Sequence, residues 1–166
     1  DVPFIEIPSA MITNEDLMKA TAKSGKRVII STGMSTEEEI DQAVDWLKDT
    51  DLAILHCNST YPAPLEDLNL SYIPVLKERY GKEVGYSGHE FRLGTSVAAV
   101  YLGASIIERH ITLDRQMWGS DHLGSVEPQG LIKMCTGIRE LEVAYGDGIK
   151  VITDGEKPIR KKLRGN

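Results

Sequence analysis

The chain has 166 residues, of which 41% are hydrophobic and 27% are charged, an ordinary composition for a globular domain. Its formal net charge of -6 argues against nucleic acids and anionic membranes as partners, because both bind to broad basic surfaces. No apolar run reaches the roughly 20 residues that a membrane span requires, and no signal-peptide pattern opens the sequence.

Apolar runs typical of strands alternate with helix signals along the chain. Strands are expected at residues 4–7, 27–33, 52–57, 84–90 and 104–112. Helices are expected after residues 13–16, over 40–47, over 70–80, over 93–102 and from Pro128 to Tyr145. A capping box is expected at Ser35–Glu38. The charged tail from Gly148 is poor in apolar residues and is interpreted as a linker.

This rhythm predicts a parallel α/β sheet, and the strand ends distinguish between two versions of it. A small doubly wound sheet fits the length, but every expected strand ends in polar groups, which favours a (β/α)8 TIM barrel. Five βα units are visible where a closed barrel needs eight. The sequence also lacks an initial methionine and opens almost directly in a strand. We therefore expect a fragment, with a partial barrel over residues 1–147.

Two histidines at neighbouring strand ends are the main candidate site. His89 ends the run 84–90 and His110 lies in the run 104–112, with one helix between the two runs. Neutral imidazoles at adjacent strand ends are suited to share one divalent metal ion. Glu108 lies on the same face of its strand as His110, so it is a candidate metal ligand or a partner that orients an imidazole.

Each of these residues also has a purely structural interpretation. A lone strand-end histidine is more often a hydrogen-bonded structural residue, and Glu108 could form a salt bridge inside the barrel. His56 is expected to be a core residue, and His122 has only a modest chance of contacting substrate. Cys57 and Cys135 lie far apart without zinc-ligand spacing, so we expect reduced core thiols, which suits a cytoplasmic protein.

Several short runs, in matching order along nearly the whole chain, resemble the sialic acid synthase (N-acetylneuraminate synthase) family. They are residues 4–9, 30–34, 56–62, 85–89, 108–114, 119–122 and 127–128. The resemblance implies barrel strands four to eight, followed at 148–166 by the start of a linker toward an antifreeze-like domain. It also implies a homodimer in the full-length protein.

The resemblance further implies a transferase that condenses phosphoenolpyruvate with an N-acetylated hexosamine such as N-acetylmannosamine. The products are a nine-carbon 2-keto sugar acid and phosphate. By position, His89 and His110 resemble ligands of manganese or magnesium, and Glu108 lies beside them. Residues expected to bind phosphoenolpyruvate or the acceptor sugar are Ser9, Ser31, Ser59, Tyr61, Ser87 and Asp121.

Glu6 departs from the family, which generally has lysine at this place in the strand. Strand alternation points Glu6 into the barrel, so the anion site loses a cation and gains a carboxylate. Three alternatives therefore stay open: a legionaminic or pseudaminic acid synthase, a non-catalytic sugar-binding descendant, and an unrelated two-histidine hydrolase barrel. The family's first three strands and its antifreeze-like domain are also absent, so we expect this chain alone to be inactive.

Overall fold

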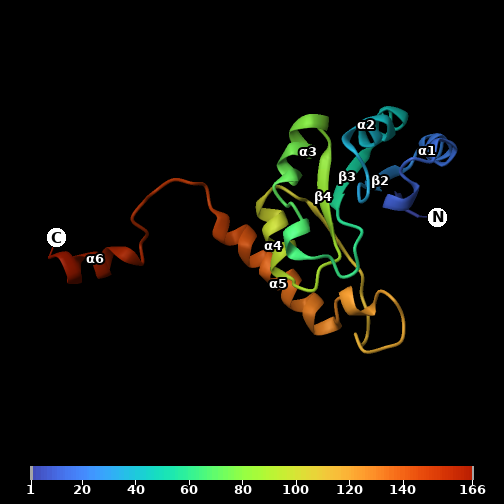
Figure 1. Ribbon diagram of the computed structural model, residues 1–166. Coiled ribbons are helices and arrows are strands. Elements are labelled where there is room, and N and C mark those ends of the chain that lie inside the picture. The colour runs from blue at the N-terminus through green and yellow to red at the C-terminus, as the bar shows by residue number, and fades with distance from the viewer. Residues whose placement is uncertain (1, 166) are drawn as a thin grey trace.

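The computed structural model describes residues 2–165, which contain one five-stranded parallel sheet in the order β1-β2-β3-β4-β5 (Figure 1). The strands are β1 (Phe4–Ile7), β2 (Arg27–Ser31), β3 (Leu52–Cys57), β4 (Glu83–Gly88) and β5 (Ile106–Arg109). The helices are α1 (Glu15–Ala22), α2 (Glu37–Trp46), α3 (Tyr72–Tyr80), α4 (Gly94–Tyr101), α5 (Pro128–Tyr145) and α6 (Glu156–Arg164). Short 3-10 turns are η1 (Ser9–Met11), η2 (Leu65–Asp67) and η3 (His122–Gly124). The expected five βα units are confirmed.

The helices cover one face of the sheet and bury most of the apolar side chains there. Alternate strand residues, such as Ile30 and Ile54, pack against helix residues such as Ile40 and Leu76 in one continuous core. The opposite face carries only a small apolar cluster. Period-two alternation in the strands and the apolar stripes of the helices thus explain the two layers.

The sheet is curved, with the uncovered face on the inside. Glu6 on β1 and Glu108 on β5 belong to opposite edges, which in a flat sheet would lie roughly 19 Å apart at about 4.8 Å per strand spacing. Their carboxyl groups are nevertheless close enough to share a hydrogen bond. The five strands therefore curl as part of a barrel, and the side chains of the inner face converge.

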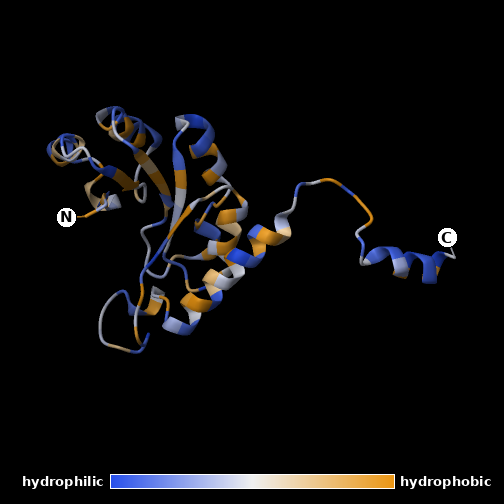
Figure 2. Ribbon diagram, turned by 180° about the vertical axis from the view of Figure 1, so that it is seen from behind, coloured by the Kyte–Doolittle hydropathy of each residue, from blue (hydrophilic) through white to orange (hydrophobic). Residues whose placement is uncertain are grey.

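Two local details differ from the sequence-based expectations. The capping box of α2 is formed by Thr36 and Glu39, one residue later than expected, because both registers have a hydroxyl residue three positions before a glutamate. The tail contains α6, which lies beyond an extended segment away from the sheet and is mostly hydrophilic (Figures 1 and 2). Among residues 2–165, no helix is both long enough and apolar enough to cross a membrane.

Gly85 in β4 is required by the close packing of the sheet's inner face. A Cβ atom there would lie 2.4 Å from Leu55 Cδ2 and 2.6 Å from the Ile106 backbone oxygen. Because backbone cannot yield as a flexible side chain does, Gly85→Ala is expected to lower the free energy of unfolding by about 1–3 kcal/mol in urea titration. Gly94→Ala in α4 is the control, since a Cβ at Gly94 meets nothing within 4 Å. Equal stability of the two variants would contradict this packing.

Candidate active site

Polar side chains follow the apolar cluster along the concave face and gather at the carboxyl ends of the strands. Because side chains alternate across each strand, Ile29 is followed on that face by Ser31, and Leu55 is followed by Cys57. Strand register then places Cys57 beside Ser87, and Ser87 beside Glu108. A row of small polar groups therefore crosses β2 to β5 at the edge where ligands bind in parallel α/β folds.

These groups line a cavity of about 440 Å³. All the residues predicted for the site except Asp121 contribute to its wall, namely Ser9, Ser31, Ser59, Tyr61, Ser87, His89, Glu108 and His110. Glu6, Pro8, Ala10, Met34 and Cys57 complete the lining. The structure thus brings the predicted residues together, while their individual roles remain predictions.

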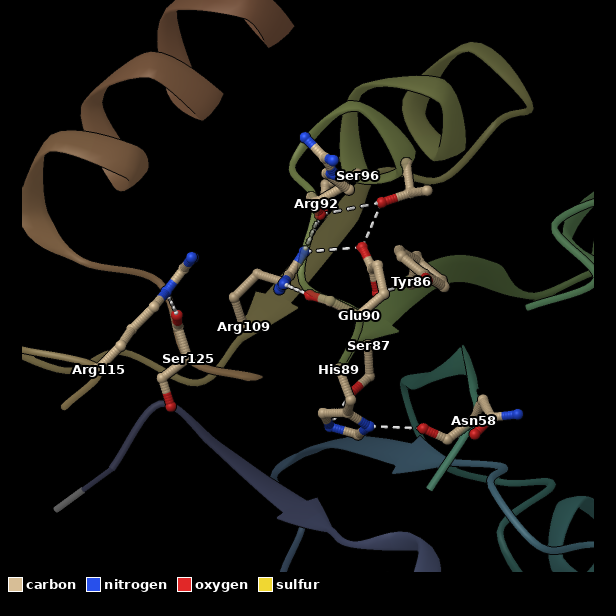
Figure 3. Close-up of polar contacts among 11 residues, drawn as sticks. Asn58, Tyr86, Ser87, His89, Glu90, Arg92, Ser96, Arg109, Arg115 and Ser125 are labelled. Atoms are coloured by element: carbon tan, nitrogen blue, oxygen red, sulfur yellow. Dashed lines mark hydrogen bonds and ion pairs between the residues drawn. The ribbon is translucent and has the colours of Figure 1, made fainter. Parts of the chain in front are cut away.

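His89 is held in one tautomer by the backbone. Its Nδ1 lies 2.6 Å from the Asn58 carbonyl oxygen, which can only accept a hydrogen bond, so Nδ1 carries the proton (Figure 3). Its Nε2 lies 3.4 Å from Ser87 Oγ, but the single hydroxyl proton of Ser87 is donated to Glu108 Oε1 at 2.7 Å. The lone pair on Nε2 is therefore not filled by Ser87 and is directed toward the cavity.

His110 lies beside His89 in the cavity wall. The ring centroids are 5.2 Å apart and the rings meet nearly edge to face, at 88°. Tyr61 contacts both, with centroids 4.2 Å from His89 and 5.4 Å from His110. The neighbouring imidazoles inferred from the strand ends are thus confirmed as a pair.

Asp121, predicted to bind the acceptor, lies outside the cavity lining. Its Oδ2 is 3.9 Å from His110 Nδ1, so it faces the metal-binding candidate from the loop after β5. At this distance the carboxylate acts on His110 through its charge. It also places a polar group near the mouth of the cavity.

Glu6 and Glu108 form a carboxyl pair at the bottom of the site. The hydrogen bond from Glu108, followed by desolvation and the negative charge of Glu108, raises the pKa of Glu6 to about 8. Since Glu6 is an exposed side chain, its neighbour rather than burial is the main cause. The expected inward direction of Glu6 is confirmed, and near neutral pH this carboxyl group holds a proton.

Two hydroxyl groups have arrangements suited to an anionic ligand. Ser9 Oγ accepts a hydrogen bond of 2.9 Å from the Gly33 backbone nitrogen, in the turn after β2. Ser31 Oγ is buried at the cavity wall and has no hydrogen-bond partner among the described residues. A buried hydroxyl without a partner is costly, so a ligand in the cavity that pairs with it would remove that cost.

The protein groups available to a metal ion are limited. Among residues 2–165 there is no group of three or more His, Cys, Asp or Glu side chains arranged to hold a metal. The two imidazoles fit as a partial ligand set, because His89 presents a free Nε2 and its other nitrogen is fixed by a carbonyl, the usual support for a ligating histidine. Any further ligands must come from water, substrate or groups beyond these residues.

The remaining histidines and cysteines divide between correct and wrong expectations. His56 is a core residue, with Nε2 2.7 Å from the Leu68 oxygen, as expected. His122 contacts Thr112 Oγ1 at 2.7 Å and lines an apolar pocket outside this cavity. The expectation that Cys135 is a core thiol is wrong: it lies on the exposed side of α5, away from the buried Met134.

Cys57 is buried as expected, but it is also part of the site. Its Sγ lies 3.6 Å from Ser9 Oγ and 3.8 Å from His89 Nδ1, and burial raises the pKa of the thiol. A neutral thiol therefore fills the gap between β1 and the histidine. Strand alternation was the signal that would have placed it in the site, since Cys57 shares a face with Leu55.

The sequence of residues 1–150 matches the model of the NeuB family. The chain belongs to the NeuB family. It is 43% identical over 169 residues to the N,N'-diacetyllegionaminic acid synthase of Campylobacter jejuni, covering 96% of this chain and 51% of that protein. It is 41% identical to the N-acetylneuraminate-9-phosphate synthase of Drosophila melanogaster, covering 100% of this chain and 44% of that protein.

A solved NeuB-family structure has the same fold. The sialic acid synthetase of Leptospira borgpetersenii, crystallised with citrate, matches with a TM-score of 0.86 and 36% identity, covering 99% of this chain and 60% of that one. The partial (β/α)8 barrel is therefore confirmed. This NeuB-family chain spans about half the length of the relatives it matches.

Proposed function

We propose that this chain forms part of the catalytic barrel of a nonulosonic acid synthase. The reaction is the condensation of phosphoenolpyruvate with an N-acetylated hexosamine, giving a nine-carbon 2-keto sugar acid and phosphate. The observation that carries the proposal is that the predicted site residues, except Asp121, line one cavity at the carboxyl edge of the sheet. The names of its relatives, synthases of legionaminic and neuraminic acid compounds, support the same chemistry.

In this proposal the hydroxyl groups bind the anionic substrate. Ser31 has an unpartnered hydroxyl, and Ser9 is oriented by the Gly33 nitrogen, so both are positioned for phosphate or carboxylate oxygens. Holding a highly charged enol in line with an aldehyde lowers the barrier mainly by positioning and charge neutralisation. Tyr61 covers the two imidazoles and closes one side of the cavity over the acceptor.

We further propose that His89 and His110 hold a divalent ion, manganese or magnesium. Their support is the pair of adjacent rings and the free Nε2 of His89. When bound, such an ion supplies Lewis-acid polarisation of the acceptor aldehyde. Glu108 holds Ser87 by a hydrogen bond and thereby keeps that hydroxyl from protonating the His89 lone pair.

The full reaction also sets the proposed partners and place of the protein. The acceptor is an N-acetylhexosamine, with N-acetylmannosamine as the first candidate and the legionaminic or pseudaminic precursors as alternatives, since a few loop contacts decide among them. A homodimer and a cytoplasmic location complete the proposal.

The carboxyl pair supports a second candidate, a non-catalytic sugar-binding descendant. Glu6 adds a carboxyl group where an anionic substrate would approach, which weakens phosphoenolpyruvate binding but not the binding of a neutral sugar. The two candidates differ in one measurable respect. Only the synthase requires phosphoenolpyruvate to bind.

The proposal is tested with the protein encoded by the complete reading frame that contains these residues. Phosphate release from phosphoenolpyruvate is expected to depend on both an N-acetylhexosamine and Mn²⁺, with a keto acid product of matching mass. Parallel assays with N-acetylmannosamine and with an acceptor bearing two acetamido groups identify the sugar. Sugar binding without any phosphate release would instead support the sugar-binding descendant.

A further inference from the structure

Glu90 and Arg109 form a buried ion pair directly behind the two histidines. Arg109 Nη1 lies 2.8 Å from Glu90 Oε1, and the side chains are 1% and 0% exposed. Glu90 follows His89 in the chain, and Arg109 precedes His110. Strand alternation therefore turns the pair away from the cavity, and Figure 3 shows it on the opposite side of β4 from the His89 ring.

The pair is embedded in a nearly complete hydrogen-bond network between the sheet and α4. Glu90 accepts bonds from Tyr86 Oη at 2.9 Å and from Thr95 Oγ1. Arg109 Nη1 donates to Ser96 Oγ and to the Arg92 oxygen, both at 3.1 Å, and Nη2 donates to the Glu90 backbone oxygen. This last bond joins the Arg109 side chain directly to the backbone next to His89.

The β ladder alone does not fix the histidines relative to each other. The register of β4 and β5 ends at the pair Gly88 and Arg109, one residue before each imidazole. Beyond that point, the His89 oxygen is bound by the Ala63 nitrogen, and the His110 oxygen by the Val126 nitrogen, so each strand end is attached to a different loop. The Glu90–Arg109 pair is what connects the two ends to each other.

Stability alone is a weak reason for such a pair. Desolvating two charges offsets much of their attraction, and apolar replacements of similar size are often as stable as a buried ion pair. A pair with directional hydrogen bonds does, however, define one geometry, whereas apolar side chains tolerate several.

We propose that Glu90 and Arg109 are positioning residues that set the spacing and orientation of the His89 and His110 imidazoles. The positioning itself rests on the contacts described above. Its consequence for a metal ion rests on the proposed function.

The test uses the double variant Glu90→Met/Arg109→Met, which replaces the charges by apolar side chains of similar length. Ring-proton NOEs between His89 and His110 are measured without metal, because centroids 5.2 Å apart place ring protons in contact. Mn²⁺ affinity is measured by calorimetry. The variant is expected to fold, to lose the inter-ring NOEs and to bind Mn²⁺ about 10-fold more weakly or worse.

The control is Arg27→Met/Glu83→Met, an ion pair that is 34% and 40% exposed and joins the other ends of β2 and β4. It is expected to leave both readouts unchanged. A folded Glu90→Met/Arg109→Met protein with intact NOEs and wild-type Mn²⁺ affinity would show that the pair is merely structural and overturn the inference. If the wild type binds no Mn²⁺ but the NOEs still disappear in the variant, the metal proposal fails and the positioning role stands.

Arg109→Lys is the second variant, in case the double variant does not fold. It keeps the charge but cannot contact Glu90, Ser96 and the Glu90 backbone together. Shifted ring resonances of His110, with weaker inter-ring NOEs, are expected. Unchanged ring signals in this variant would equally overturn the inference.

Discussion

Replacing His110 with alanine is expected to weaken Mn²⁺ binding by this chain at least about 100-fold, because losing a residue that merely supports a ligand already costs 10- to 100-fold. Only two imidazoles of this chain face the proposed ion, so His89 alone would remain. A single neutral imidazole is a weak site for Mn²⁺, which stands at the low end of the divalent affinity order. Calorimetry and the Mn²⁺ electron paramagnetic resonance signal both measure the loss.

The matched control for His110→Ala is His122→Ala. His122 follows the same strand and is bonded to Thr112, but it lies outside the cavity. Its removal is expected to leave Mn²⁺ affinity unchanged. Equal affinities for the wild type and His110→Ala, or equal losses in the two variants, would exclude His110 as a ligand and leave the cavity without its proposed metal.

Strand alternation explains why so much of the site could be predicted from the sequence. Once the strands were placed, period two fixed that Ser87 and His89 share a face, and that Glu108 and His110 share a face on the next strand. The parallel sheet then brought these faces together at one edge. The same argument placed Glu6 on the inner face.

Contacts across the barrel could not be predicted in the same way. Glu6 and Glu108 lie four strands apart, so their meeting depends on how strongly the sheet curves, which no local pattern encodes. Asp121 lies in a loop with no periodicity, and its position relative to His110 follows from the loop path alone. The Glu90–Arg109 pair was missed because charged residues at strand ends usually face solvent, and here α4 covers them.

Replacing Glu6 with lysine is expected to strengthen phosphoenolpyruvate binding to this chain by about 10-fold at pH 8, because a cation replaces a carboxyl group beside the anion site. The factor is kept modest since Glu6 is exposed and solvent screens its charge. Titration followed by NMR shifts of Ser9 and Ser31 measures the affinity. Glu6→Gln is the control for charge removal alone, and it is expected to fall between the wild type and Glu6→Lys.

The pKa of Glu6 gives this experiment a second readout in the absence of ligand. Because the pKa is raised from 4.5 to about 8, the folded chain holds a proton that the unfolded chain has released over this range. The folded state then binds more protons than the unfolded state, so the free energy of unfolding falls as pH rises from about 4.5 to 8 and levels off above it. Glu6→Gln is expected to remove this contribution to the slope in urea titrations, and phosphoenolpyruvate affinity of the wild type is expected to decline from pH 7 to 9 while that of Glu6→Gln stays level. Identical pH profiles for the two proteins would show that Glu6 and Glu108 do not share a proton, and that the carboxyl group of Glu6 is no obstacle to an anionic substrate.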